Sequence, residues 1–385
     1  MTGYFFHASV IIKIRGKRLA GSCNMDQKDA LKKEIIKRFG TPCVVIDLDV
    51  VEANIARAQQ LCDAAGIANR PHIKTHKSPI LAHTQIAAGA TGITCQKLGE
   101  AEVMADAGIT DIIIATNLLG AAQSGQLAAL QRRLPLKCCA DSAFTLSAYA
   151  SAARAADRPL DVLIECDTGQ KRAGVETPDD VLALAAIIQE SQWLNFAGLL
   201  FYPPLDGWQE TQIFLDDVRA GLSAMGLEIG IISTGGTPNL ANLGQLDGAT
   251  EHRAGTCIFN DRMMLAAGMA SLDDCALHVF TSVASRGGEA RGILDAGSKT
   301  LTSDAGGLEG FGLIREYPDA RINKFSEEHG FLDLSDCRQQ PQVGDIVRVI
   351  PNHVCVVVNM VDQLVAVRGN DIIEVIPVAA RGKLV

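Results

Sequence analysis

The segment PHIKTHK, residues 71–77, carries a lysine where a buried strand candidate ends. In an extended chain His72 and Lys74 point to one face and Ile73 to the other, so the lysine amine faces the polar mouth of the sheet. An amine held there is partly desolvated, which lowers its pKa and lets it attack an aldehyde. The segment therefore predicts Schiff-base chemistry at Lys74, with a salt-bridged lysine at the rim as the alternative.

A histidine and a cysteine stand two positions apart in PNHVC, residues 351–355. On a strand, His353 and Cys355 would share one face. Imidazole and thiolate together hold divalent metals, and the soft sulfur favours zinc. Two protein ligands leave positions open for water and substrate, which suits a catalytic ion. The alternative is a histidine beside a buried cysteine in an ordinary core.

Two glycine turns have the composition of a phosphate cradle. STGGTPNL, residues 233–240, follows a strand candidate and precedes a helix start, and HRAGT, residues 252–256, supplies a second turn. Backbone amides in such turns bind anions, although a Gly-Gly turn is also common after any strand. The residues predicted to bind phosphate are Thr234, Gly235, Gly236, Thr237, Gly255 and Thr256.

Two further polar residues follow strand candidates. Arg172 in ECDTGQKRAGV could hydrogen-bond an anionic oxygen of a cofactor or substrate. Tyr202 in FYPP could pack against a bound ring. An exposed arginine paired with Asp167 or Glu165, and a tyrosine that caps the core, are the alternatives.

The elements that must position these residues alternate from residue 41 onward: short apolar runs are followed by longer, alanine-rich amphipathic stretches, which is typical of βα units. Nine strand candidates occur, at 44–48, 70–75, 92–96, 111–116, 136–140, 160–166, 195–202, 229–233 and 249–253. A closed barrel needs eight. We therefore predict a (β/α)8 TIM-type barrel that starts at residue 70, and we assign 44–48 to a second domain.

After about residue 275 the chain reads as strands joined by short polar turns, which predicts a C-terminal β domain. This gives four expected parts. They are a disordered extension at 1–24, a helix and strand at 25–48 that pair with the β domain, the barrel at 49–275, and the β domain at 276–385.

The composition of the 385 residues is globular, with 48% hydrophobic and 21% charged residues, and the net charge of −9 argues against a nucleic-acid partner. Eleven irregularly spaced cysteines indicate reduced thiols and a cytoplasmic protein. No apolar stretch reaches the roughly 18 residues of a membrane span. The first residues place the basic cluster after the apolar run, the reverse of a secretory signal.

Taken together, several motifs in order resemble the D-threonine aldolase and D-serine dehydratase family, which is alanine-racemase-like and uses pyridoxal 5'-phosphate (PLP). They are TPCVVIDLDVVEANI, RPHIKTHKSP, GITCQKLGEAE, ECDTGQKRAGV, STGGTP, EHRAGT, LDAGSK, EEHG and PNHVC. The resemblance spans about residues 25–385. It implies that Lys74 carries PLP, with Arg172 beside its phenolic oxygen and Tyr202 near its ring. It further implies that the glycine turns hold the phosphate, and that His353 and Cys355 bind a metal.

The resemblance leaves the reaction open between two outcomes on a D-3-hydroxy amino acid. CQK at 95–97 and the ending VAVRGNDIIEVIPVAARGK resemble the aldolases, so we favour retro-aldol cleavage of a D-threonine-like substrate to glycine and an aldehyde. The His-x-Cys pair resembles the dehydratases, which give a 2-oxo acid and ammonia. Racemases of this kind need a second base, a tyrosine from the β domain, and the only tyrosine after Tyr202 is Tyr317, so a racemase ranks low. A non-catalytic PLP carrier also ranks low, because such carriers lack the second domain.

The same resemblance implies a homodimer and a metal that acts as a Lewis acid on the substrate hydroxyl. Thiolate ligation favours zinc, whereas the aldolase interpretation favours manganese or magnesium. We expect His76 or a bound hydroxide as the base beside the metal. Cys257 departs from the family, because similar proteins often have tyrosine there, which puts one phosphate or packing contact in doubt.

Overall fold

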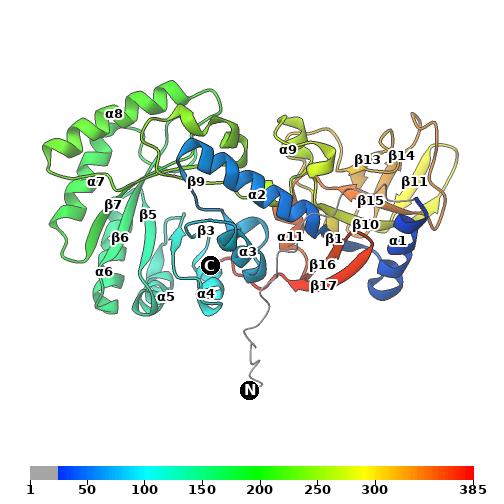
Figure 1. Cartoon of the computed structure of the whole chain (residues 1–385), viewed down its shortest axis with the longest axis horizontal. Coiled ribbons are helices and arrows are strands. Elements are labelled where there is room, and N and C mark those ends of the chain that lie inside the picture. The colour runs from blue at the N-terminus through cyan, green and yellow to red at the C-terminus, as the bar shows by residue number, and fades with distance from the viewer. Residues whose placement is uncertain (1–24) are drawn as a thin grey trace, which may run out of the picture.

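The computed structural model describes residues 25–385, so the expected extension at 1–24 lies outside the described residues. Figure 1 shows a barrel on the left and a β domain on the right, with α2 (Leu48–Ala65) running between them. Within residues 25–385, no helix is both long and apolar enough to cross a bilayer. The ten cysteines in this range are all free thiols.

The barrel is one parallel sheet of eight strands in the order β2-β9-β8-β7-β6-β5-β4-β3. Its two edge strands meet through a parallel bridge between His72 and Thr94, where Thr94 N donates to Pro71 O at 2.9 Å. This confirms the predicted TIM-type fold. The strands are β2 (Ala68–Asn69), β3 (Ile93–Cys95), β4 (Ile112–Ile114), β5 (Leu136–Ala140), β6 (Leu160–Cys166), β7 (Leu194–Phe201), β8 (Ile231–Gly235) and β9 (Glu251–Arg253).

The barrel helices cover the strands with apolar faces, and several begin at a polar cap; Ser142 and Thr177, for example, each accept a backbone N–H three residues on. Besides α2, these helices are α3 (Pro79–Ala87), α4 (Leu98–Asp106), α5 (Gly120–Arg133), α6 (Ala143–Ala156), α7 (Pro178–Glu190) and α8 (Trp208–Ala224). Shorter helices follow, namely η2 (Thr237–Gln245), η3 (Thr256–Ile258), α9 (Arg262–Ala266) and η4 (Leu272–Asp274).

The first barrel strand differs from the prediction of 70–75. Strand β2 ends at Asn69, and the 3-10 helix η1 (Ile73–Thr75) carries Lys74. Pro71 interrupts the strand because proline has no N–H to donate, but His72 N still donates to Ala254 O at 2.9 Å, and the chain turns into η1 directly after it. Lys74 therefore lies on a tight turn at the end of the strand, and not on the strand itself as we predicted.

The β domain is a nine-stranded mixed sheet in which the N-terminal strand β1 (Cys43–Asp47) lies between two late strands. It pairs antiparallel with β10 and parallel with β16. The helix α1 (Met25–Phe39) also packs on this sheet (Figure 1). The other strands are β10 (Leu277–Arg286), β11 (Arg291–Leu294), β12 (Leu313–Ile314), β13 (Arg321–Phe325), β14 (Gly330–Asp333), β15 (Ile346–Ile350), β16 (Gln363–Arg368) and β17 (Asp371–Pro377).

The segment after Pro351 is helical, so the predicted strand through His353 and Cys355 is wrong. Helix α11 (Val354–Asn359) takes its place, and the short α10 (Ser298–Leu301) lies earlier in the domain. The valines at 354, 357 and 358 are buried together in the core of the β domain. This i, i+3, i+4 spacing is that of one helix face, so packing overrides the β preference of valine.

Gly198 in β7 offers a test of the barrel packing. Its φ is +150°, and a Cβ there would overlap the carbonyl oxygen of Ile231 on β8. Gly198→Ala is expected to lower the free energy of unfolding by about 3 kcal/mol or more, through strain and overlap together. Urea unfolding measures this change. Gly226→Ala is the matched control: its φ is +72° but a Cβ there meets nothing within 4 Å, so about 1 kcal/mol is expected. Equal losses would contradict the packing argument.

Candidate active site

The amine of Lys74 lies half-buried at the barrel mouth. The η1 turn is capped by His72, whose Nδ1 accepts the backbone N–H of Lys74 at 3.4 Å. Among residues 25–385, no hydrogen bond or ion pair is found for Nζ. Burial lowers the pKa of Lys74, and Arg172 lowers it further, while the charges of Cys355 and Glu100 act in the opposite direction. A larger share of this amine is therefore neutral than in an exposed lysine.

The thiol of Cys355 joins the β domain to the barrel. Its Sγ lies 3.2 Å from Thr75 Oγ1 and 3.8 Å from Thr256 Oγ1. Because Thr75 directly follows Lys74, the thiol and the lysine amine belong to one site. Burial raises the pKa of the Cys355 thiol, but hydrogen bonds to His353 and Thr75 and the charges of His353 and Lys74 together outweigh burial, and the pKa falls below its usual value. Cys355 thus has thiolate character, as a metal ligand requires.

His353 lies at the N-terminal end of α11, beside Cys355. Its Nδ1 is 2.7 Å from Asp304 Oδ2, so Nε2 is the nitrogen left to bind a metal. Hydrogen bonding to Cys355, and then to Asp304, raises the pKa of His353 to about 9. Within residues 25–385 no group of three or more potential metal ligands is found, so the pair supplies two positions.

The two glycine turns meet in the structure and form a cradle. Gly236 has a φ of +100°, and a Cβ there would lie 2.5 Å from Tyr202 Cε2. In the second turn, a Cβ on Gly255 would lie 2.9 Å from Thr75 Oγ1. The hydroxyl of Thr237 accepts the Cys257 N–H at 3.1 Å and ties the turns together. Only glycine fits these two positions, and the backbone amides of Thr237 and Thr256, which begin η2 and η3, have no acceptor among the described residues.

Arg172 and Tyr202 lie together, as neighbours of this cradle. The guanidinium of Arg172 is 4.9 Å from the centre of the Tyr202 ring. It also lies 3.6 Å from Glu165 Oε1, which is the ion pair considered as the alternative. The Arg172 side chain is 57% exposed, so it remains open to a ligand.

Two predicted residues are already engaged elsewhere. The hydroxyl of Thr234 hydrogen-bonds His252 Nδ1 at 2.8 Å within the barrel wall, so only its backbone is left for a phosphate. His76 is fully buried; its Nε2 contacts Gln85 Oε1 at 3.1 Å, and its Nδ1 accepts the Ser78 N–H at 3.1 Å. Burial lowers the pKa of His76 to about 4. With both ring nitrogens occupied, His76 has no free nitrogen with which to act as the base.

Two residues of the site were not found by sequence reasoning. Thr75 contacts the Cys355 thiol, and Asp304 holds His353. Thr75 adjoins a predicted site residue, which is a usable signal. Asp304 stands in a glycine-rich loop with no recognisable pattern, and only the folded chain brings it to His353.

Comparisons with known proteins fit this arrangement. Residues 46–263 match the family described as alanine racemase, N-terminal domain, and residues 276–367 match the serine dehydratase domain family. The chain belongs to the alanine-racemase-like D-threonine aldolase and D-serine dehydratase family. Members of this family are PLP enzymes, and the two matched regions correspond to the barrel and the β domain of Figure 1.

Members of the family align over most of the chain. A D-threonine aldolase from Arthrobacter sp. is 34% identical, covering 90% of this chain and 94% of that protein. The D-threo-3-hydroxyaspartate dehydratase of Delftia sp. (strain HT23) is also 34% identical, covering 84% and 93%. A crystal structure of D-threonine aldolase from Filomicrobium marinum superposes with a TM-score of 0.82 at 31% identity, covering 90% and 96%.

Two solved variants of D-threo-3-hydroxyaspartate dehydratase bear on the His353 and Cys355 pair. One replaces a histidine and the other a cysteine two positions later, and the cysteine variant is described as the metal-free form. The two structures superpose with TM-scores of 0.80 and 0.78 at 30% and 31% identity, each covering 88% of this chain. The spacing equals that of the pair in this chain.

Proposed function

We propose that this protein is a PLP- and divalent-metal-dependent lyase that acts on D-3-hydroxy amino acids. One observation carries the proposal: the Cys355 thiol lies 3.2 Å from Thr75, the neighbour of Lys74, so the lysine and the metal pair face one space. The lysine amine that would bind the cofactor and a Lewis-acid site on the same space can act on adjacent carbons of one small substrate.

The residues present fit PLP. The cradle excludes a Cβ at Gly236 and Gly255, which leaves room for a phosphate against the backbone amides of η2 and η3. Arg172 and Tyr202 lie where a ring and its anionic oxygen would be held. When bound, PLP supplies an electron sink for negative charge at the substrate Cα. Lys74 binds it and, with its lowered pKa, moves the proton at Cα.

The residues present also fit a divalent metal. Cys355 has thiolate character, and Asp304 fixes His353 so that Nε2 is available. A bound ion supplies a Lewis acid for the 3-hydroxyl of the substrate. Zinc suits the thiolate, and manganese or magnesium are the alternatives.

Two reactions remain as candidates within this class. Retro-aldol cleavage, favoured by the sequence, removes the hydroxyl proton and breaks the bond between Cα and Cβ. The β-elimination is favoured by Cys355, because the metal-free dehydratase variant lacks a cysteine at the same spacing from a histidine. In both, Lys74 handles the proton at Cα, and the metal pair orients the hydroxyl.

Product analysis with D-threonine separates the two reactions. The purified protein is incubated with PLP and D-threonine, with and without a chelator. Glycine and acetaldehyde, lost on chelation, would establish the aldolase, whereas ammonia and 2-oxobutyrate would establish the dehydratase. If D-threonine and other D-3-hydroxy acids give neither set of products, the lyase proposal is wrong.

Asp304→Asn tests how the metal ligand His353 is held. Loss of the carboxylate 2.7 Å from Nδ1 is expected to weaken metal affinity about 10- to 100-fold. Chelator titration followed by metal analysis measures this directly, without reference to activity. Asp333→Asn is the matched control, because among residues 25–385 that carboxylate hydrogen-bonds only Ser335, on the surface of the same domain. Unchanged metal affinity in Asp304→Asn would show that the carboxylate does not support the site.

The proposal keeps the domain boundaries expected from the sequence, with the barrel at 49–275 and the β domain at 276–385. It also keeps the expectation of a cytoplasmic homodimer. Gel filtration with light scattering of the purified chain tests the dimer.

A further inference from the structure

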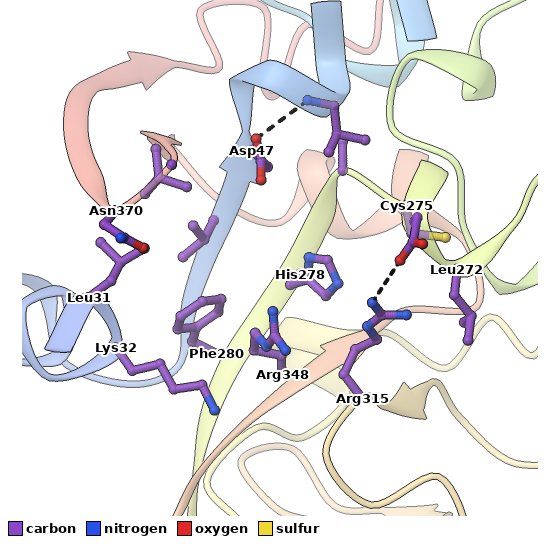
Figure 2. A pocket seen from close by; sticks show the side chains of 16 residues that line it. Leu31, Lys32, Asp47, Leu272, Cys275, His278, Phe280, Arg315, Arg348 and Asn370 are labelled. Carbon is purple, nitrogen blue, oxygen red and sulfur yellow. Dashed lines mark hydrogen bonds and ion pairs between the residues drawn. The ribbon is translucent and has the colours of Figure 1, made fainter. Parts of the chain in front are cut away.

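A second polar cavity lies in the β domain, on a different face of the sheet from the domain core. Val279 on β10 points into that core, whereas its neighbours His278 and Phe280 point to the opposite face. The register places Arg348 of β15 opposite Phe280 and Val45 of β1 opposite His278. The cavity has a volume of about 300 Å³ (Figure 2).

Three polar side chains converge on this cavity. Figure 2 shows the His278 ring beside Arg348 and Arg315. The Nε2 of His278 is buried and has no hydrogen-bond partner among the described residues. Arg348 uses Nε to bond Glu316 at 2.8 Å, and Arg315 uses one terminal nitrogen to bond Asp273 at 3.3 Å. Both guanidinium groups therefore have N–H donors to spare for a ligand.

The ring of His278 stays neutral. Burial, and then the charges of Arg348 and Arg315, lower its pKa to about 3. A neutral imidazole carries one N–H donor and one acceptor, and either can face the cavity. A buried ring nitrogen without a partner is costly to the fold unless something binds it.

Two carboxylates, Asp47 and Asp273, face this cavity, and each has one oxygen engaged. Asp47 accepts the amides of Asp49 and Val50 at 3.0 and 3.4 Å, where it caps α2. Asp273 holds Arg315, and Glu316, just behind the wall, accepts from both Lys32 and Arg348. Against these two carboxylates the cavity carries three cationic side chains, Lys32, Arg315 and Arg348, so positive charge exceeds negative charge along its wall.

Although Lys32 and Asn370 also line the cavity, an apolar part of its wall is formed by Leu31, Val45, Phe280 and Val367. These residues lie between α1 and the sheet, where Val45, Phe280 and Val367 also belong to a small core cluster. A volume of about 300 Å³ is at the lower end for small-molecule sites, so the ligand must be small.

We propose that this cavity binds a small carboxylate with an apolar body, held by Arg315, Arg348 and His278 and packed against Phe280. The N–H donors of a guanidinium group match the two oxygens of a carboxylate. Burial of a ring or branched chain against the apolar wall would stabilise the bound ligand. The site is separate from Lys74, so it is a second ligand site and not part of the lyase chemistry.

Phenylacetate is the probe, and calorimetry or ligand-observed NMR measures its binding to the full chain. Phenylacetamide has the same body without the charge, and acetate has the charge without the body; each is expected to bind at least about tenfold more weakly. Arg315→Gln is expected to weaken phenylacetate binding about tenfold or more. Arg321→Gln, which loses a surface pair to Asp336, is the matched control and should bind normally.

Lys74→Ala separates this cavity from the active site, because binding of phenylacetate should persist in that variant. Three results would overturn the proposal: no binding of phenylacetate, equal binding of phenylacetate and phenylacetamide, or loss of binding in Lys74→Ala with retention in Arg315→Gln. The ligand comparison uses the unaltered protein, so it decides the matter even if a variant folds poorly.

Discussion

Replacing Lys74 with alanine is expected to lower kcat by about 10³-fold or more and to abolish covalent attachment of PLP. The amine is half-buried, its pKa is lowered by burial, and no partner among the described residues competes for it. Borohydride reduction followed by peptide mass analysis measures the attachment, and the visible absorbance of the bound cofactor reports on it independently.

Lys77→Gln is the control for this prediction. Lys77 belongs to the same PHIKTHK segment, but its amine lies 2.8 Å from Asn359 Oδ1 and 3.4 Å from Glu100 Oε1. It should therefore carry no cofactor, and Lys77→Gln should still be labelled at residue 74. A reduced adduct on any other lysine, or full activity of Lys74→Ala, would refute the assignment of Lys74.

Cys355→Ala is expected to lose bound metal and to lower kcat by about 10²- to 10⁴-fold, since a Lewis acid contributes several kcal/mol to such reactions. The variant removes one of only two ligands that the site supplies, and leaves His353 paired with Asp304. Metal content of the purified protein and activity after metal is added back are the two measurements.

Cys337→Ala controls for the loss of a cysteine in the same domain, because Cys337, like Cys355, is half-buried and packs against the core of the β domain but is not part of the pair with His353. It should keep its metal and its activity. If Cys355→Ala holds metal as tightly as the control does, Cys355 is not a ligand, and the thiol has another role beside Lys74.

The barrel could be predicted because its strands are short apolar runs with polar ends. The predicted bounds of β5 and β6 agree with the structure residue for residue. Strands of this kind are buried on both faces, so almost every residue in them is apolar, and the first polar residue marks where each strand ends. The β domain was recognised for a different reason, namely the absence of long amphipathic stretches after residue 275.

The errors occurred where local preference and packing disagree. Valine favours strands, yet the valines of α11 form a helix because three of them fill the core of the β domain. The chain keeps sheet hydrogen bonds as far as His72, whose N–H donates to Ala254 O, and then turns into η1, so Lys74 is presented on a turn. The pairing of Asp304 with His353 depends on contacts distant in sequence, and no spacing rule reveals it.

The position of β1 also bears on how the chain folds as it is made. This strand is synthesised early, but its sheet partners β10 and β16 leave the ribosome only when most of the chain has been translated. Until then its apolar side chains have no sheet to join, although the barrel that follows can already assemble. His353 and Cys355, the proposed metal pair at the start of α11, also emerge late, so a nascent chain with a complete barrel still lacks part of the proposed active site.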